Sequence, residues 1–199
     1  GWFSLGHTLP NVPAKDKPAL DLMNYILAGG HFATRMWLEL RDKRGLTNTV
    51  GGYPEFTSDG TGTYTFRSYG RPEVIHQIVG IMLREMKGIR ESKVTAEELQ
   101  IAKSAFTESR FEMQYANPTA TTQTFAREWL QHGDFSRSAS YVDRYNAVTI
   151  GQIHRAARKY LQPDRLQMVL VGPIDKIMAS ENQEHAFHLR EFGKMEAGK

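Results

Sequence analysis

Seven histidines and 22 acidic residues are the side chains of this 199-residue chain that could bind a metal ion or move a proton. Catalytic zinc sites usually take three protein ligands, often two histidines four residues apart on one helix face. The chain contains no H-x-x-E-H string. Its nearest equivalent is Glu181-Asn182-Gln183-Glu184-His185, with His188 three residues further on. We expect this segment to be a solvated helix or a frayed tail rather than a metal site.

The remaining histidines are scattered along the chain and show no spacing that suggests a catalytic triad; they are His7, His31, His76, His132 and His154. We expect each of them to be a surface or hydrogen-bonded structural residue. The sequence has no G-x-S-x-G elbow, no P-loop and no cysteine, and Gly60-Thr61-Gly62 is more typical of a hairpin than of a phosphate-binding loop. We therefore predict that this chain alone has no catalytic residues and no metal site.

The elements that would position any functional side chain are clearest between Leu20 and Tyr53. A helical spacing of apolar residues predicts a first buried helix face, made of Leu20, Met23, Ile26 and Leu27. Gly29-Gly30 is expected to end this helix in the left-handed conformation. A second helix runs into Arg41-Asp42-Lys43-Arg44 and stops at Gly45, and an extended segment is predicted over 46–53.

Start and stop signals divide the rest of the chain. Strands are predicted over 2–5, 60–68 and 166–171, and the apolar run of the last one places it in the centre of the sheet. Capping boxes at Thr95/Glu98 and Thr149/Gln152 predict two helix starts. Asn117-Pro118 predicts a third start and Gly133 the end of that helix. Inward-facing residues are predicted on separate elements: Ile78, Leu99, Ala102, Phe106, Met113, Phe125, Trp129, Leu130 and Val169.

Early strands, one late strand and intervening helices indicate an α+β fold. We expect a two-layer sandwich with one mixed, mostly antiparallel sheet and helices packed on one face. The length fits a single domain over 1–175, followed by a helical or frayed tail over 176–199.

Composition excludes some classes of function. No apolar run is long enough to span a membrane. The net charge of +3 is only mildly basic and the basic residues are dispersed, so we expect no nucleic-acid partner. The absence of cysteine fits both the bacterial periplasm and the cytoplasm, and leaves the compartment open.

The stretch LMNYILAGGHFATRMWLELRDKRGLTNTV, over 22–50, resembles the pattern LxNxILGGGxxSRLxxxLREKRGLAYSV of the pitrilysin/insulinase zinc peptidase family, which includes the mitochondrial processing peptidases. Two further segments, EELQIAKSAF and YLQPDRLQMVLVGP, resemble later family motifs. The resemblance is to the C-terminal, non-catalytic half of these enzymes and covers nearly the whole chain.

The resemblance implies a peptide-binding site. In the family, an arginine and a tyrosine seven residues apart bind substrate, and these positions fall on Arg41 and Asn48. Arginine offers several fixed donors to a peptide carbonyl or carboxylate. Asparagine keeps an amide donor but lacks the hydroxyl that would stabilise charge in the transition state. Without the resemblance, Arg41 would be interpreted as a solvated helix-end cation. Arg35 matches the arginine of the family's SRL, and we expect it to form a structural ion pair rather than a substrate contact.

Two functions stay open. The chain is either the non-catalytic half of a zinc metallopeptidase, binding extended peptide and closing over a separate zinc-bearing half, or a catalytically inert scaffold subunit of the same family. The first function, that of a non-catalytic half, implies zinc in the partner half and none in this chain. The zinc-bearing half could belong to the same polypeptide or to another subunit, and a homodimer is also open.

Overall fold

The computed structural model describes all residues except 31, 58–60, 181–186, 193–195 and 197–199. The elements, in chain order, are β1 (Trp2–Leu9), α1 (Lys17–Asn24), η1 (Tyr25–Gly29), α2 (Arg35–Trp37), η2 (Leu38–Asp42), β2 (Val50–Phe56), β3 (Gly62–Tyr69), η3 (Pro72–Val74), α3 (Ile75–Glu91), α4 (Ala96–Ser104), η4 (Ala105–Arg110), α5 (Phe111–Gln114), α6 (Pro118–His132), α7 (Ser136–Ala139), α8 (Tyr141–Asn146), α9 (Ile150–Tyr160), η5 (Pro163–Arg165), β4 (Gln167–Val171), α10 (Ile174–Ala179) and η6 (Leu189–Phe192).

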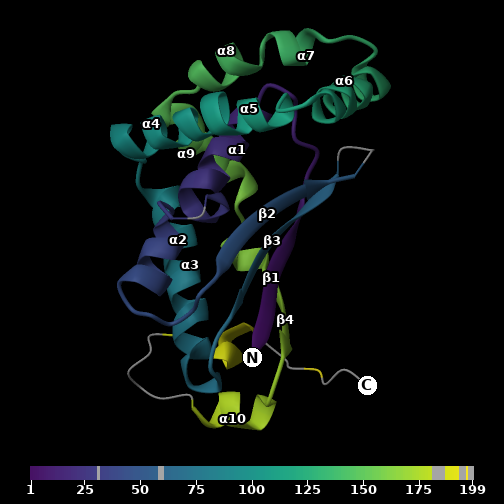
Figure 1. Cartoon of the computed structure of the whole chain (residues 1–199). Coiled ribbons are helices and arrows are strands. Elements are labelled where there is room, and N and C mark those ends of the chain that lie inside the picture. Colours follow the sequence, from purple (N-terminus) through teal and green to yellow (C-terminus); the bar gives the residue numbers. More distant parts are fainter. Residues whose placement is uncertain (31, 58–60, 181–186, 193–195, 197–199) are drawn as a thin grey trace.

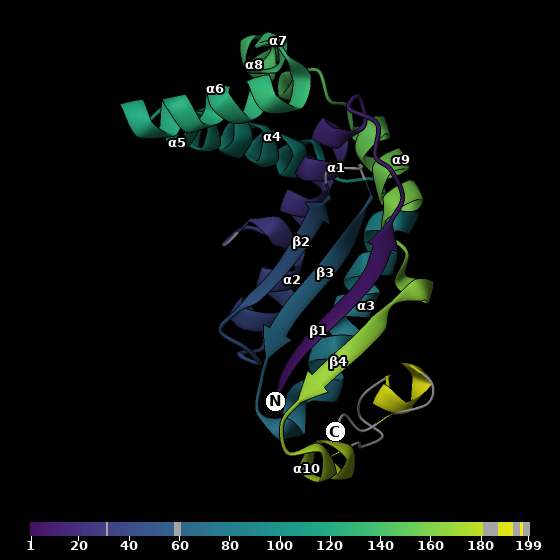
Figure 2. The ribbon, with the colours of Figure 1, turned by 90° about the vertical axis from the view of Figure 1, so that its right-hand side faces the viewer.

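The four strands form one sheet in the order β2-β3-β1-β4, and every neighbouring pair is antiparallel. Phe3, Leu5 and Leu9 of β1 are buried, whereas Trp2 on the opposite face is 63% exposed. Helices α1, α2, α3 and α9 lie on the buried face (Figure 1), and Figure 2 looks onto the other face of the sheet. The α+β fold class predicted from the sequence is therefore confirmed.

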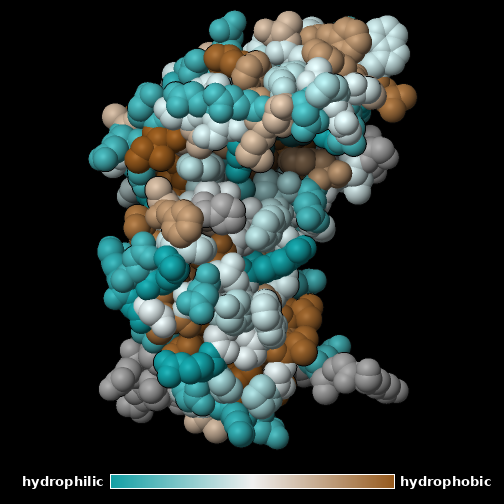
Figure 3. Space-filling model, viewed as in Figure 1, coloured by the Kyte–Doolittle hydropathy of each residue, from teal (hydrophilic) through white to brown (hydrophobic). Residues whose placement is uncertain are grey.

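The last strand does not lie where its composition predicted. β4 pairs with β1 alone and forms one edge of the sheet. Val169 is 66% exposed and Val171 is 65% exposed, because both side chains point to the face opposite the helices. The predictions of a central β4 and an inward Val169 are wrong, and Figure 3 shows apolar surface along this margin beside β4.

The core prediction fails again in the outer helical layer formed by α5, α6, α7 and α8. Ile78 and Phe106 are buried as predicted, with 0% and 4% exposure. Trp129, Leu130 and Met113 were also predicted to face inward, but they are 56%, 85% and 70% exposed. Since α6 packs mainly against α5 and α7, its apolar residues have no sheet to cover.

Most of the predicted helix caps are confirmed. Both capping boxes form, with reciprocal bonds between Thr95 and Glu98 and between Thr149 and Gln152. Asn117 caps α6, and Gly133 ends it with φ +74°.

Gly30 departs from its predicted conformation. It is extended, with φ −98°. The first helix, α1, instead continues into the π-helical turn η1 and ends there. The left-handed prediction for Gly29-Gly30 is wrong; the glycines with positive φ in the described chain are Gly45, Gly133 and Gly172.

Segments after β4 also pack on α3. Ile177 and Leu189 are buried. The imidazole of His76 links them: its Nε2 lies 3.0 Å from the carbonyl oxygen of Ile177, and its Nδ1 accepts a hydrogen bond of 3.2 Å from the backbone N–H of Leu189. The boundary between 1–175 and 176–199 stays a prediction.

Candidate functional site

Arg41 is positioned by a short helix that begins and ends at defined residues. The hydroxyl of Thr34 accepts a hydrogen bond from Trp37 N–H and caps α2. η2 continues α2 to Asp42, and Gly45, with φ +60°, turns the chain so that its N–H bonds to the carbonyl of Arg41 at 2.8 Å. The guanidinium of Arg41 lies over the Trp37 ring, 5.0 Å from its centroid. This packing holds the side chain in place while 42% of it stays exposed.

The other cations at this helix end have a structural role that the sequence did not reveal. The carboxylate of Glu39 binds Lys43 at 2.5 Å, Arg44 at 2.6 Å and Arg84 of α3 at 2.9 Å. Hydrogen bonding by Lys43, together with Arg44, holds the pKa of Glu39 below its ordinary value. Arg41 is not part of this network; its contact with a carboxylate is a long one, 3.4 Å to the adjacent Asp42. The i,i+4 spacing of Glu39 and Lys43 is the one signal that could have indicated the network.

Asn48 lies in the segment between Gly45 and β2, and its side chain is exposed. The residues on either side anchor this segment. Thr47 is buried, its hydroxyl donates to the carbonyl of Thr49 at 2.9 Å, and Ser68 of β3 donates to the same carbonyl at 2.8 Å. Arg41 and Asn48 thus flank the Gly45 turn as two exposed side chains, and no contact joins them in the described chain.

The first helix, α1, presents no set of zinc ligands among the described residues. Leu20, Met23 and Asn24 are buried, and two of them are apolar. The Asn24 amide donates to the carbonyl of Gly52 at 3.0 Å and accepts from the Tyr64 hydroxyl at 2.7 Å. In the part of the chain that the structure describes, no three His, Cys, Asp or Glu residues gather closely enough to hold a metal ion.

The Glu181–His185 string lies outside the described residues. The neighbouring His188 is described, and its backbone N–H donates to Glu191 at 3.0 Å.

Three histidines have the structural contacts predicted for them. His76 joins Ile177 and Leu189, as described above. His7 accepts a hydrogen bond from Gln162 N–H at 3.2 Å, and burial lowers its pKa. His154 lies 2.9 Å from the carbonyl of Arg90. His31 lies outside the described residues.

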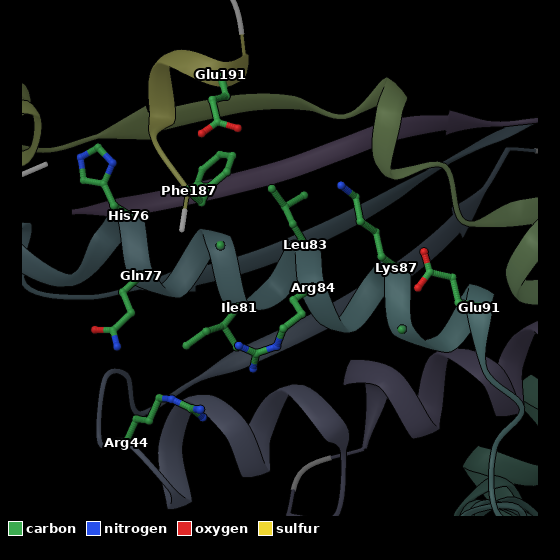
Figure 4. A pocket seen from close by; sticks show the side chains of 12 residues that line it. Arg44, His76, Gln77, Ile81, Leu83, Arg84, Lys87, Glu91, Phe187 and Glu191 are labelled. Carbon is green, nitrogen blue, oxygen red and sulfur yellow. The ribbon is translucent and has the colours of Figure 1, made fainter. Parts of the chain in front are cut away.

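A cavity of about 600 Å³ runs along α3 on the helical side of the molecule. Figure 4 shows Arg44 and Gln77 at one side of it, and Phe187 and Glu191 at the other. Of its cations, Arg44 and Arg84 both bind Glu39. We therefore assign these two side chains to the structure of the helical layer.

The described helices include none that is both long and apolar enough to cross a membrane.

Comparison with known families identifies the class of protein. Residues 1–106 match the family model described as the peptidase M16 inactive domain. The match spans more than half of the chain, and the chain belongs to this family.

Solved structures with a similar fold include a domain of the same family. A peptidase M16 inactive domain from Pseudomonas fluorescens is 25% identical, with a TM-score of 0.70 over 84% of this chain and 40% of that chain. A protease from Helicobacter pylori is 19% identical, with a TM-score of 0.72 over 84% of this chain and 39% of that chain. The inactive peptidase domain assigned to a zinc protease of Bordetella parapertussis is 21% identical, with a TM-score of 0.69 over 84% of this chain and 88% of that chain.

The chain therefore spans about two fifths of the first two structures and most of the third. Comparison with curated proteins gives no significant match.

Proposed function

We propose that this domain is the non-catalytic half of a zinc metallopeptidase, which binds extended peptide and closes over a separate zinc-bearing half. Membership of the inactive-domain family supports this assignment. The zinc ion would belong to the partner half, on the same polypeptide or on another subunit.

Arg41 carries the proposal. Among the four charged residues of the helix end, Lys43 and Arg44 bind Glu39. Arg41 instead lies over Trp37 and keeps 42% of its side chain exposed. A guanidinium that is held in place by an aromatic ring, yet accessible, suits recognition of a peptide carbonyl or carboxylate.

The peptide would reach Arg41 along the edge of the sheet. Asn48 lies two residues before β2, and β2 is an edge strand. An extended peptide that added to this edge would pass Asn48 and form main-chain hydrogen bonds with β2. Pro54 has no N–H to donate, so we expect the pairing to involve mainly the Val50–Tyr53 half of the strand.

A second candidate function is an inert scaffold subunit of the same family. One observation favours it: Asn48 stands where the resembling domains have tyrosine, and an amide cannot replace the phenolic hydroxyl in the transition state. Peptide binding does not need that hydroxyl, so we retain the first function and let the experiment separate the two.

The test uses the two-half enzyme, reconstituted from this chain and its zinc-bearing partner. Arg41→Ala should weaken peptide binding about tenfold, because a charge-assisted hydrogen bond contributes about 1.5–3 kcal/mol. Arg155→Ala, which removes an exposed arginine of α9, is the matched control and should bind normally. Asn48→Tyr should raise turnover more than affinity.

Unchanged binding in Arg41→Ala together with unchanged turnover in Asn48→Tyr would favour the scaffold function instead.

A further inference from the structure

A second pocket lies in the outer helical layer, away from the Gly45 turn. It is open to solvent, has a volume of about 220 Å³ and is lined by residues of α5, α6, α7 and α8. Three arginines on three different helices line it: Arg127 of α6, Arg137 of α7 and Arg144 of α8. His132, at the end of α6, lines it as well.

The acidic group in this pocket is already engaged. Glu128 is buried, and one carboxylate oxygen accepts the backbone N–H groups of Arg137 at 2.7 Å and Ser138 at 2.9 Å. Its other oxygen accepts the hydroxyl of Ser138. Burial opposes ionisation of Glu128, but these hydrogen bonds outweigh it and hold its pKa below the ordinary value. The carboxylate of Glu128 therefore binds the backbone and the hydroxyl at the start of α7. No hydrogen bond joins it to a guanidinium group in the described part of the chain.

The arginines have no carboxylate of their own. Among the described residues, none of the three lies within salt-bridge distance of an acidic group. The nearby Asp134 accepts both the backbone N–H and the hydroxyl of Ser136, at 2.9 Å and 2.7 Å. The three arginines outnumber the one carboxylate of the pocket lining, Glu128, so positive charge remains in excess, and in folded proteins such an excess is usually compensated by a counter-charge.

Arg144 also has hydrogen-bonding capacity to spare. Its Nη2 donates to the carbonyl of Arg137 at 2.8 Å, which fixes the guanidinium. Its Nε is buried and has no hydrogen-bond partner in the described part of the chain. Buried donors of this kind are rare in proteins unless a ligand or water satisfies them.

We propose that this pocket binds an oxyanion, in the form of a free phosphate or the carboxylate of an acidic peptide. The planar fork of arginine matches both groups with paired hydrogen bonds. The volume is below the range of about 300–1,000 Å³ typical of sites for drug-sized ligands, so it suits a single anionic group. The site is separate from Arg41 and does not depend on the peptide-binding function proposed above.

The experiment titrates the isotope-labelled 199-residue chain with inorganic phosphate, and separately with an N-acetylated, C-terminally amidated tetraglutamate peptide, at constant ionic strength. The backbone signals of Arg137 and Ser138 and the side-chain Nε–H signal of Arg144 report on the pocket. We expect saturable shifts in these signals with at least one of the two probes. Phosphate alone would identify a free-anion site, and the peptide alone a carboxylate site.

Variants separate a built site from general attraction between charges. Arg137→Gln and Arg127→Gln should each weaken binding about tenfold or more, since each removes one charged donor. Both variants keep the backbone groups that bind Glu128. Arg155→Gln, which neutralises an exposed arginine on α9, is the control and should bind as the unmodified chain does.

No saturable shift with either probe would overturn the proposal. An equal loss of binding in Arg155→Gln and in the pocket variants would overturn it as well, because only the net charge would then matter.

Discussion

Arg35 and Glu98 form a two-pronged ion pair that joins α2 to the start of α4. Arg35 Nε lies 2.7 Å from one carboxylate oxygen of Glu98, and Nη2 lies 2.9 Å from the other. The second oxygen also accepts the backbone N–H of Thr95 at 2.8 Å and closes the capping box. One carboxylate therefore fixes the N-terminus of α4 and holds it to the helix that carries Arg41.

Removing Arg35 should destabilise the fold. Both side chains are largely buried, with exposures of 20% and 26%, and loss of the arginine leaves Glu98 without its partner. We expect Arg35→Ala to lower the free energy of unfolding by about 1.5–3 kcal/mol. Urea denaturation measures this, and Arg71→Ala, at an exposed position, is the control. A midpoint equal to that of the unmodified chain would show that the ion pair adds nothing.

The same pair predicts a dependence on pH. Burial alone would raise the pKa of Glu98, but hydrogen bonds from Arg35 and Thr95 hold it below the ordinary value of 4.5. A lowered pKa means that the stabilisation is fully present above pH 4.5 and is lost as the pH falls through the lower pKa of the folded state. The stability gap between the unmodified chain and Glu98→Gln should therefore narrow below pH 4.5, whereas Glu97→Gln, at the exposed neighbouring position, should show no comparable gap at any pH.

Replacement by alanine should have opposite effects on stability at two glycines, Gly52 and Gly88. A Cβ at Gly52 would lie 2.6 Å from Asn24 Oδ1 and 2.9 Å from the Phe66 ring, so Gly52→Ala should disturb the bonds between Asn24 and the sheet. A Cβ at Gly88, inside α3, meets nothing within 4 Å among the described residues. Gly88→Ala should stabilise the chain by up to about 1 kcal/mol, since alanine is the better helix former. Thermal melting of both variants checks the signs, and a stabilising Gly52→Ala would contradict the packing described here.

Aromatic truncations should separate the core from the outer helices. Phe106 is 4% exposed and stacks on Tyr145 with a ring-centroid distance of 4.7 Å, so Phe106→Ala should cost about 3–5 kcal/mol. Trp129 is 56% exposed, and Trp129→Ala should cost much less despite the larger ring. Calorimetry measures the loss of unfolding free energy in each variant. Equal losses in Phe106→Ala and Trp129→Ala would mean that α6 is as well packed as η4.

Local signals in the sequence predicted local structure well. The capping boxes at Thr95 and Thr149 formed because their bonds span only three residues. Arg35 forms the structural ion pair that we expected of it, although its partner Glu98 lies 63 residues away. The sequence could not name that partner, since nothing in a local pattern measures distance across the fold.

Burial of apolar residues was harder to predict where the partner layer is missing. The apolar run of β4 resembles a central strand, but its alternate residues face away from the helices, and Val169 is exposed. Helical periodicity placed Trp129 on an apolar face of α6 without showing that no sheet lies beneath it. Periodicity identifies which residues share a face; it does not show what covers that face.

The candidate site was predicted only in part. The family resemblance singled out Arg41 and Asn48, and their peptide-binding role stays a prediction. The Glu39 network, which distinguishes Arg41 from Lys43 and Arg44, depends on Arg84 of α3. That residue is 45 positions away from Glu39, so no local pattern indicated this contact.

The most direct test of the proposed function is reconstitution. The partner to use is a homologous half with an H-x-x-E-H motif, sought in the same or an adjacent reading frame. Its cleavage of a fluorogenic peptide is measured with zinc present, first alone and then with increasing amounts of this chain. We predict little or no cleavage by the zinc-bearing half alone, saturable activation as the chain is added, and weaker peptide binding when the added chain carries Arg41→Ala. Cleavage that is the same with and without this chain would contradict the account.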